Sequence, residues 1–222
     1  MTVSVRFRKA LILSTIVFSC LFFFLSCSDN NNSVATESDT LTRFERLLAK
    51  YKLISFDTLK VYYDREQGVK GKYSGTPLAN DEIDLLPDEL PGRSNHEEFY
   101  ACFKFPIDSS RIGLITRTPS TYESSSIKLL VYDQKADSIL YHVELAEEWG
   151  DAGEKLSKRS WLYMSAGQPE VFTETVYTYD RSVANETDTI IDVNETFYIL
   201  ELGKIRADTN KNVSEDLRAS FY

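Results

Sequence analysis

From residue 98 onward, the chain is a succession of short segments rich in β-branched and aromatic residues, each bounded by Ser, Asp, Asn or Gly. Such segments are typical of β-strands. No helical period interrupts them, which disfavours a parallel sheet, and the short connections favour antiparallel meanders. The expected strands are 98–105, 111–118, 127–133, 138–146, 158–164, 171–180, 187–193 and 196–204.

We therefore predict a mainly β fold, in which an antiparallel sheet curls or doubles into a sandwich or an open barrel. The clearest hairpin lies at 127–146, where apolar residues alternate on both strands around the connection Asp133–Asp137. The same run resembles the outer hairpin of a β-propeller blade, so a propeller-like fragment is the alternative. The sequence shows no repeat at the spacing that a propeller requires.

Two features precede the strands. Apolar residues at helical spacing predict one N-terminal helix at about 40–52, capped by Thr42 with Glu45 or by Asp39 and Thr40. The stretch 64–97 holds four of the nine glycines and three of the six prolines and reads as a long loop, functional or mobile. We expect residues 39–222 to form a single β-rich domain that contains this loop.

The first 26 residues have the character of a secretory signal. Arg6, Arg8 and Lys9 occur without an acidic residue and are followed by the apolar block Ala10–Phe24. A basic start before a short apolar block is typical of a signal peptide. The block is also shorter than a membrane span of about 20 residues. An uncleaved anchor helix is the alternative.

The triplet Leu25-Ser26-Cys27 resembles the lipobox of bacterial lipoproteins, with Phe24 where that family usually has Leu. The resemblance implies removal of residues 1–26 and a diacylglycerol on the sulfur of Cys27, with Cys20 as a second candidate. Residues 27–38 then form a lipidated flexible tether. The polar run after Cys27 also looks like that of Bacteroidota lipoproteins, which implies a cell-envelope protein anchored to the outer membrane and facing the periplasm or the cell surface.

The charge of the mature chain limits the kinds of partner it can bind, and its cysteine content limits its thiol chemistry. Removal of residues 1–26 takes away three basic residues and leaves 22 basic and 34 acidic side chains, a net charge of −12. Nucleic acids are bound through clustered Lys and Arg, so we expect no nucleic-acid partner. With Cys27 acylated, Cys102 is the one thiol left in the mature chain, and its strand-like context predicts a buried structural side chain.

Candidate chemistry is sparse, because the two histidines lack zinc spacing and no Gly-x-Ser-x-Gly or phosphate-loop motif occurs. We expect no cofactor, with Ca²⁺ as the alternative, held by acidic residues of the stretch 147–154. The alternative interpretation is that these acidic residues lie on a solvent-exposed loop and bind no metal. The candidate ligands are Glu147, Glu148, Asp151 and Glu154.

Aromatic residues supply candidate glycan contacts, and hydroxyl residues supply candidate O-glycosylation sites. Exposed aromatic rings can stack on sugars, although aromatic residues of a sheet also fill its core. Bacteroidota secretory proteins can be O-glycosylated where Asp-Ser/Thr precedes an apolar residue, although this pattern also introduces strands and helices. The candidate glycan contacts are Trp149, Trp161, Tyr177 and Tyr179, and the candidate modification sites are Thr40, Thr58, Ser138 and Thr189.

The leading prediction is a membrane-anchored lipoprotein that acts as a non-catalytic binding or envelope-interaction module, with an envelope protein or a glycan as its partner. The alternatives are an envelope hydrolase built on the loops 64–97 and 147–154, a calcium-dependent carbohydrate-binding protein, and a structural assembly subunit. An enzyme predicts a pocket with converging titratable groups. A glycan binder predicts coplanar exposed aromatic rings, and an assembly subunit predicts an apolar patch or an unpaired sheet edge.

Overall fold

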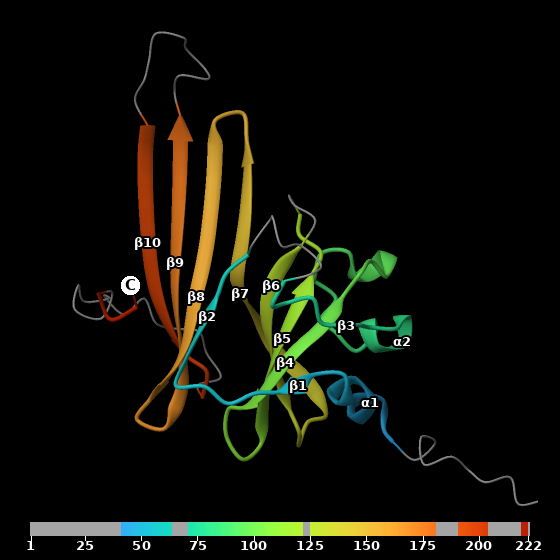
Figure 1. The fold of residues 1–222 in the computed structure, drawn as a ribbon. Coiled ribbons are helices and arrows are strands. Elements are labelled where there is room, and N and C mark those ends of the chain that lie inside the picture. Colours follow the sequence, from blue (N-terminus) through green and yellow to red (C-terminus); the bar gives the residue numbers. More distant parts are fainter. Residues whose placement is uncertain (1–40, 64–70, 122–124, 181–190, 204–218, 222) are drawn as a thin grey trace, which may run out of the picture. The chain divides into compact units, whose positions relative to one another are not determined.

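A computed structural model describes residues 41–63, 71–121, 125–180, 191–203 and 219–221 (Figure 1). The described strands form one ten-stranded sheet. The predicted mainly β fold is confirmed, and the sheet resembles a sandwich and does not close into a barrel. A propeller blade has four strands, so the propeller-like alternative does not describe this arrangement.

Seven long strands follow one another both along the chain and across the sheet, each antiparallel to its neighbour. They are β4 (Tyr100–Pro106), β5 (Arg111–Thr118), β6 (Ser126–Asp133), β7 (Ser138–Asp151), β8 (Glu154–Ser165), β9 (Gln168–Asp180) and β10 (Ile191–Glu201). Three short strands join them: β1 (Lys52–Leu53) parallel to β4, β2 (Thr58–Val61) antiparallel to β8, and β3 (Thr76–Pro77) antiparallel to β4.

Strand β7 connects two layers of this sheet. Its residues 138–146 pair with β6, whereas residues 147–151 pair with β8. Strand β2 pairs with β8 farther along, at residues 160–163. The first layer therefore contains β1, β3, β4, β5, β6 and the start of β7, and the second layer contains the end of β7, β2, β8, β9 and β10.

The main hydrophobic core joins the two layers. Ile115 and Leu129 of the first layer belong to the same buried cluster as Leu162, Val171 and Leu200 of the second. These residues alternate along their strands, which is why one face of each layer is apolar. Burial of this shared face holds the second layer against the first.

A second cluster covers the other face of the first layer. It contains Phe44 and Leu47 of helix α1 (Arg43–Ala49), Ile83 of helix α2 (Asn80–Ile83), and Leu130 of β6. Strand β6 is thus buried on both faces, since Leu129 contacts the main core and Leu130 contacts the helices. A strand covered on both sides reads as a continuous apolar run, as β6 does.

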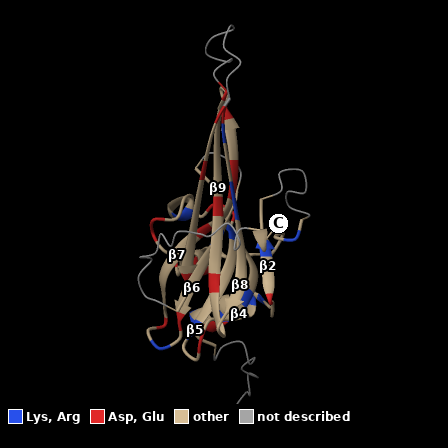
Figure 2. Cartoon of the chain, turned by 90° about the vertical axis from the view of Figure 1, so that its left-hand side faces the viewer, with Lys and Arg blue, Asp and Glu red and all other residues tan. Residues whose placement is uncertain are grey.

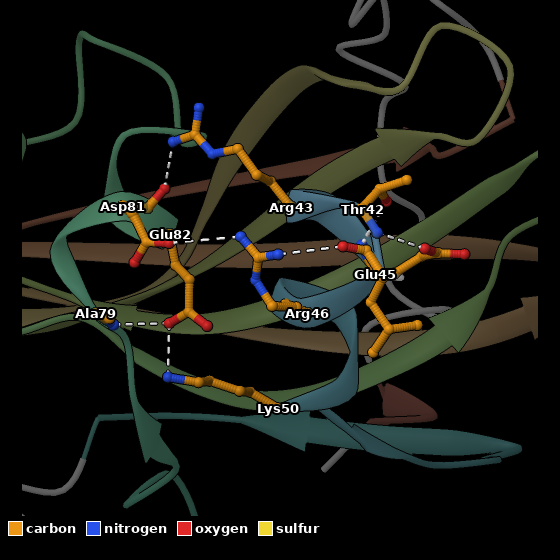
Figure 3. Close-up of polar contacts among 9 residues, drawn as sticks. Thr42, Arg43, Glu45, Arg46, Lys50, Ala79, Asp81 and Glu82 are labelled. Atoms are coloured by element: carbon orange, nitrogen blue, oxygen red, sulfur yellow. Dashed lines mark hydrogen bonds and ion pairs between the residues drawn. The ribbon is translucent and has the colours of Figure 1, made fainter. Parts of the chain in front are cut away.

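Helix α1 occupies the middle of the predicted range 40–52. Of the two caps considered, Thr42 with Glu45 lies in the described part of the chain and forms the reciprocal capping box. The helix ends early because Lys52 and Leu53 pair with β4. Figure 3 shows how α1 meets α2: the Lys50 ammonium lies 2.6 Å from the buried Glu82 carboxylate, which also accepts a hydrogen bond from the Ala79 N–H.

The described part of the predicted loop 64–97 is ordered by short elements. It contains β3, α2 and a 3₁₀ turn (Arg93–Asn95), and it buries apolar side chains against the first layer. Tyr73 joins the main core, and the side chains that join the second cluster are Leu78, Ile83, Leu86 and Leu90. Pro77 lies in β3, whereas the other described glycines and prolines of this stretch lie outside its helices and strands.

A third cluster covers the outer face of the second layer. Trp161, Phe172 and Ile199 are buried there, and Phe221 near the C-terminus stacks on Phe172 with ring centroids 4.9 Å apart. Both faces of the second layer are thus apolar around residues 160–172. The strands of this layer, however, continue beyond both clusters.

Candidate functional site

The region beyond the core is a four-stranded sheet in continuous register, which we call the distal sheet. It consists of residues 147–151, 154–158, 175–179 and 192–196 of β7, β8, β9 and β10. Figure 1 shows these strand ends lying side by side. Among the residues that the structure describes, none of these twenty belongs to a buried hydrophobic cluster.

The β7–β8 connection shapes the distal sheet. Ala152 and Gly153 have φ values of 48° and 91°, so both adopt left-handed backbone. Two such residues form the tight turn whose twist matches paired antiparallel strands. The stretch 147–154, expected from the sequence to be a loop, is therefore the paired end of two strands, and that prediction was wrong.

Strand alternation brings three of the four predicted glycan contacts to one face. Trp149, Leu156 and Tyr177 lie in one cross-strand row, and Tyr179 lies on the same face two residues farther along β9. The Trp149 and Tyr177 ring centroids are 6.3 Å apart, and their planes meet at 63°. We call this side the aromatic face. Its three rings are half-buried, and those of Trp149 and Tyr177 are not coplanar.

Trp161 lies elsewhere. It is five residues from Leu156 along β8, so its side chain points to the opposite side of the sheet. It is 2% exposed and packs against Phe172 and Phe221. Trp161 is a core residue, and the prediction that it contacts a ligand surface was wrong.

The four candidate calcium ligands are divided by the same alternation. Glu147, Asp151 and Glu154 lie on the aromatic face, whereas Glu148 points the other way, 3.0 Å from the Lys155 ammonium. Glu147 and Asp151 are four residues apart on an extended strand, which is about 13 Å. Glu147 accepts a hydrogen bond from Ser120. Within the described ranges, no three His, Cys, Asp or Glu side chains are grouped to hold a metal ion.

The distal sheet is strongly acidic. Its twenty residues include two basic side chains, Lys155 and Lys158, against six acidic ones. Figure 2 shows the acidic colour prevailing toward the ends of these strands. Desolvation raises the pKa of Tyr177, and so do its hydrogen bond to Glu154 and the nearby negative charge of that carboxylate. The acidic side chains are Glu147, Glu148, Asp151, Glu154, Asp192 and Glu195.

Two clefts flank the distal sheet. The first, of about 470 Å³, opens where β8 changes its partner from β7 to β2. The second, of about 490 Å³, surrounds the β7–β8 turn. The described lining of neither cleft contains a histidine or a cysteine. The first cleft is lined by Lys60, Tyr62, Tyr63, Glu147, Glu148, Ser157, Lys158 and Arg159.

Cys102 of β4 belongs to the main core between the two layers. Burial raises the pKa of its thiol to about 11, and the thiol donates a hydrogen bond to the Tyr73 carbonyl at 3.4 Å. A buried, protonated thiol is a poor nucleophile. The prediction of a structural cysteine is confirmed.

The candidate modification sites differ in placement. Thr58 is exposed at the first residue of β2, and Ser138 is half-buried at the first residue of β7. Both positions fit the alternative reading, in which Asp-Ser/Thr introduces a strand. Thr40, Thr189 and Cys27 lie outside the described residues, as do the predicted signal sequence and tether.

Comparison with known proteins identifies no relative: no family model, curated protein or solved structure matches the chain. Over the ranges that the structure describes, none of the helices has the length and apolar character needed to cross a membrane.

Proposed function

We propose that this protein is a lipid-anchored, non-catalytic binding module of the cell envelope whose recognition surface is the aromatic face of the distal sheet. One observation carries this proposal. Trp149, Leu156 and Tyr177 lie in register on a sheet that continues past the hydrophobic core. Tryptophan and tyrosine are enriched at the energetic centres of protein interfaces.

A protein partner fits this face better than a glycan. Stacking on sugar rings favours coplanar aromatic surfaces, whereas the Trp149 and Tyr177 planes meet at 63° with Leu156 between them in the row. An edge-to-face aromatic pair beside a leucine forms an irregular apolar surface that complements side chains. Polar residues around the rings supply the polar rim of an interface, such as Glu147 in the neighbouring row and Asn194 at the end of the same row, opposite Tyr177.

The anchor in this proposal is Cys27. Acyl chains on one residue give stable membrane attachment, because each buried CH₂ contributes about 0.8 kcal/mol. A flexible tether of residues 27–38 gives the β domain rotational freedom at the membrane surface. Such an arrangement suits a protein that captures a partner in the envelope.

Site-specific photo-crosslinking in cells tests the proposal. A photoreactive amino acid replaces Tyr177 in the full-length chain, and the matched control carries it at Lys135, an exposed residue of the β6–β7 turn. We expect a discrete protein adduct at position 177 that is absent at position 135. Equal adduct patterns at the two positions, or none at 177, would rule out this recognition surface.

A further inference from the structure

The charges around the aromatic face identify the class of partner. We infer that this face binds a cationic protein segment, in which Lys or Arg side chains flank an apolar residue. This inference rests on the proposed function and narrows it to one kind of ligand.

Charge complementarity is the first argument. The aromatic face carries four carboxylates and one ammonium group, that of Lys158. Asp151, Glu154 and Asp192 form one cross-strand row beyond Trp149 and Tyr177. Facing charges of opposite sign accelerate association and fix the register of a complex. A second copy of this acidic chain, or an anionic lipid surface, would be repelled.

Aromatic chemistry is the second argument. The faces of tryptophan and tyrosine attract ammonium and guanidinium groups, and tryptophan does so most strongly. Carboxylates beside the rings strengthen that attraction, and one of them, Glu154, accepts a hydrogen bond from the Tyr177 hydroxyl. The first layer already contains such a contact, since the Arg117 guanidinium lies 3.8 Å from the Tyr100 ring centroid.

Size is the third argument. Five residues along four strands cover about 16 Å by 19 Å, or roughly 300 Å². A stable interface between globular proteins buries about 800 Å² on each partner. The aromatic face therefore matches a short segment and is too small for a globular surface.

Fluorescence anisotropy with defined peptides tests this inference. The mature lipoprotein is reconstituted in phosphatidylcholine nanodiscs, and empty nanodiscs supply the background. The probe is the fluorescein-labelled decapeptide (Lys-Ser-Leu-Ser-Lys)₂, and its analogues carry Glu or Ser in place of Lys. The variants are Trp149→Ala and the double substitution Asp151→Asn with Glu154→Gln. The matched control, Asp88→Asn with Glu89→Gln, removes two exposed charges from a different surface.

We expect saturable binding of the lysine peptide, at least tenfold weaker binding of both analogues, and weaker binding at higher salt. Trp149→Ala should weaken binding about tenfold and the distal double variant about fivefold, while the matched control stays within about twofold. Thermal melts monitored by circular dichroism verify that each variant is folded.

Three results would overturn the inference: equal binding of the serine peptide, equal loss in the matched control, or displacement of the lysine peptide by a neutral oligosaccharide such as cellohexaose. Absence of peptide binding despite crosslinking at position 177 refutes the cationic ligand and leaves the proposed function standing. If crosslinking at 177 is also absent, both fail.

Discussion

Asp108 organises the turn between β4 and β5. Its carboxylate accepts hydrogen bonds from the backbone N–H groups of Ser110 and Arg111 at 2.8 and 2.9 Å, and from the Arg111 guanidinium. Burial opposes its ionisation, but these donors outweigh burial and hold the pKa of Asp108 at about 2. The carboxylate therefore contributes to stability in its charged form.

Replacing Asp108 with Asn should lower the free energy of unfolding by about 1 kcal/mol at pH 7, a value reduced from the full shift because the group is near solvent. The folded pKa lies below the unfolded value of about 3.9, so this contribution is present above pH 4 and is lost as the pH falls toward 2. Urea unfolding at pH 7 and pH 2.5 measures it. A deficit equal at both pH values would contradict the assignment.

Gly113 leaves space for the aromatic ring of Phe105. A Cβ at this position would lie 2.4 Å from Phe105, its cross-strand partner in β4. Gly113→Ala should therefore destabilise the protein by about 1–3 kcal/mol through overpacking. Gly203→Ala is the matched control, since its nearest contact would be 3.4 Å from Gln168. Chemical denaturation that finds equal effects of the two substitutions would refute this reading of the Phe105 site.

The proposed lipid anchor is attached to Cys27, and substitution of this residue tests it. Cys27→Ser should abolish metabolic labelling by an alkyne fatty acid and move the protein from the membrane to the soluble fraction, because one lost residue removes all acyl chains. Cys20→Ser is the control and should label normally. Labelling that survives in the Cys27 variant and disappears in the Cys20 variant would place the lipid at Cys20 instead.

Among the elements, the β7–β8 hairpin is the one whose turn can be tested most simply. Ala152 has a φ of 48°, a conformation in which asparagine is favoured over alanine. Ala152→Asn should stabilise the protein by about 0.5 kcal/mol and raise its melting temperature by about 1 °C. Ala152→Val should lower it, since a β-branched side chain is strained there. A Val variant as stable as the Asn variant would exclude this turn geometry.

Strand positions follow from the sequence wherever burial dictates them. The predicted strand 111–118 coincides with β5, and 127–133 differs from β6 by one residue, because apolar residues there face packed layers. Strand ends outside the core were missed. The acidic composition of 147–154 reads as a loop, and an Ala-Gly turn lacks the Asn-Gly or Asp-Gly signature of a tight hairpin.

The same reasoning explains β10. The sequence predicts two strands, 187–193 and 196–204, because the polar pair Asn194-Glu195 reads as a break. In the structure both residues continue one strand, opposite Tyr177 and Val176 of β9. Backbone pairing with a long neighbour outweighs the low β-propensity of asparagine and glutamate.

For the candidate site, sequence reasoning found the residue types but not their sides. It named Trp149, Trp161, Tyr177 and Tyr179 as candidate contacts; in the structure Trp161 is buried on the opposite side of the sheet from the other three. The face to which a side chain points depends on the register of its strand. That register cannot be predicted as long as residues 147–154 are assigned to a loop. Recognition of the Ala152-Gly153 turn would have assigned these side chains to their faces.

In the domain as a whole, the proposed recognition surface lies apart from the buried clusters that stabilise the fold. The three buried clusters lie in the two layers and beneath the helices, while the distal sheet lies outside them. Strand β7 makes this separation, because it pairs with β6 through Ala146 and then with β8 from Glu147. Substitutions on the distal sheet should therefore have little effect on the core, so that any change in the proposed binding can be measured on a folded protein.

A photo-crosslinking scan through residues 175–179 of β9, performed in cells on the full-length chain, tests this account most directly. Successive side chains of a strand point to opposite faces. Recognition by the aromatic face predicts strong adducts at 175, 177 and 179 and weak adducts at 176 and 178. Adducts of equal strength at all five positions, or strongest at 176 and 178, would contradict it.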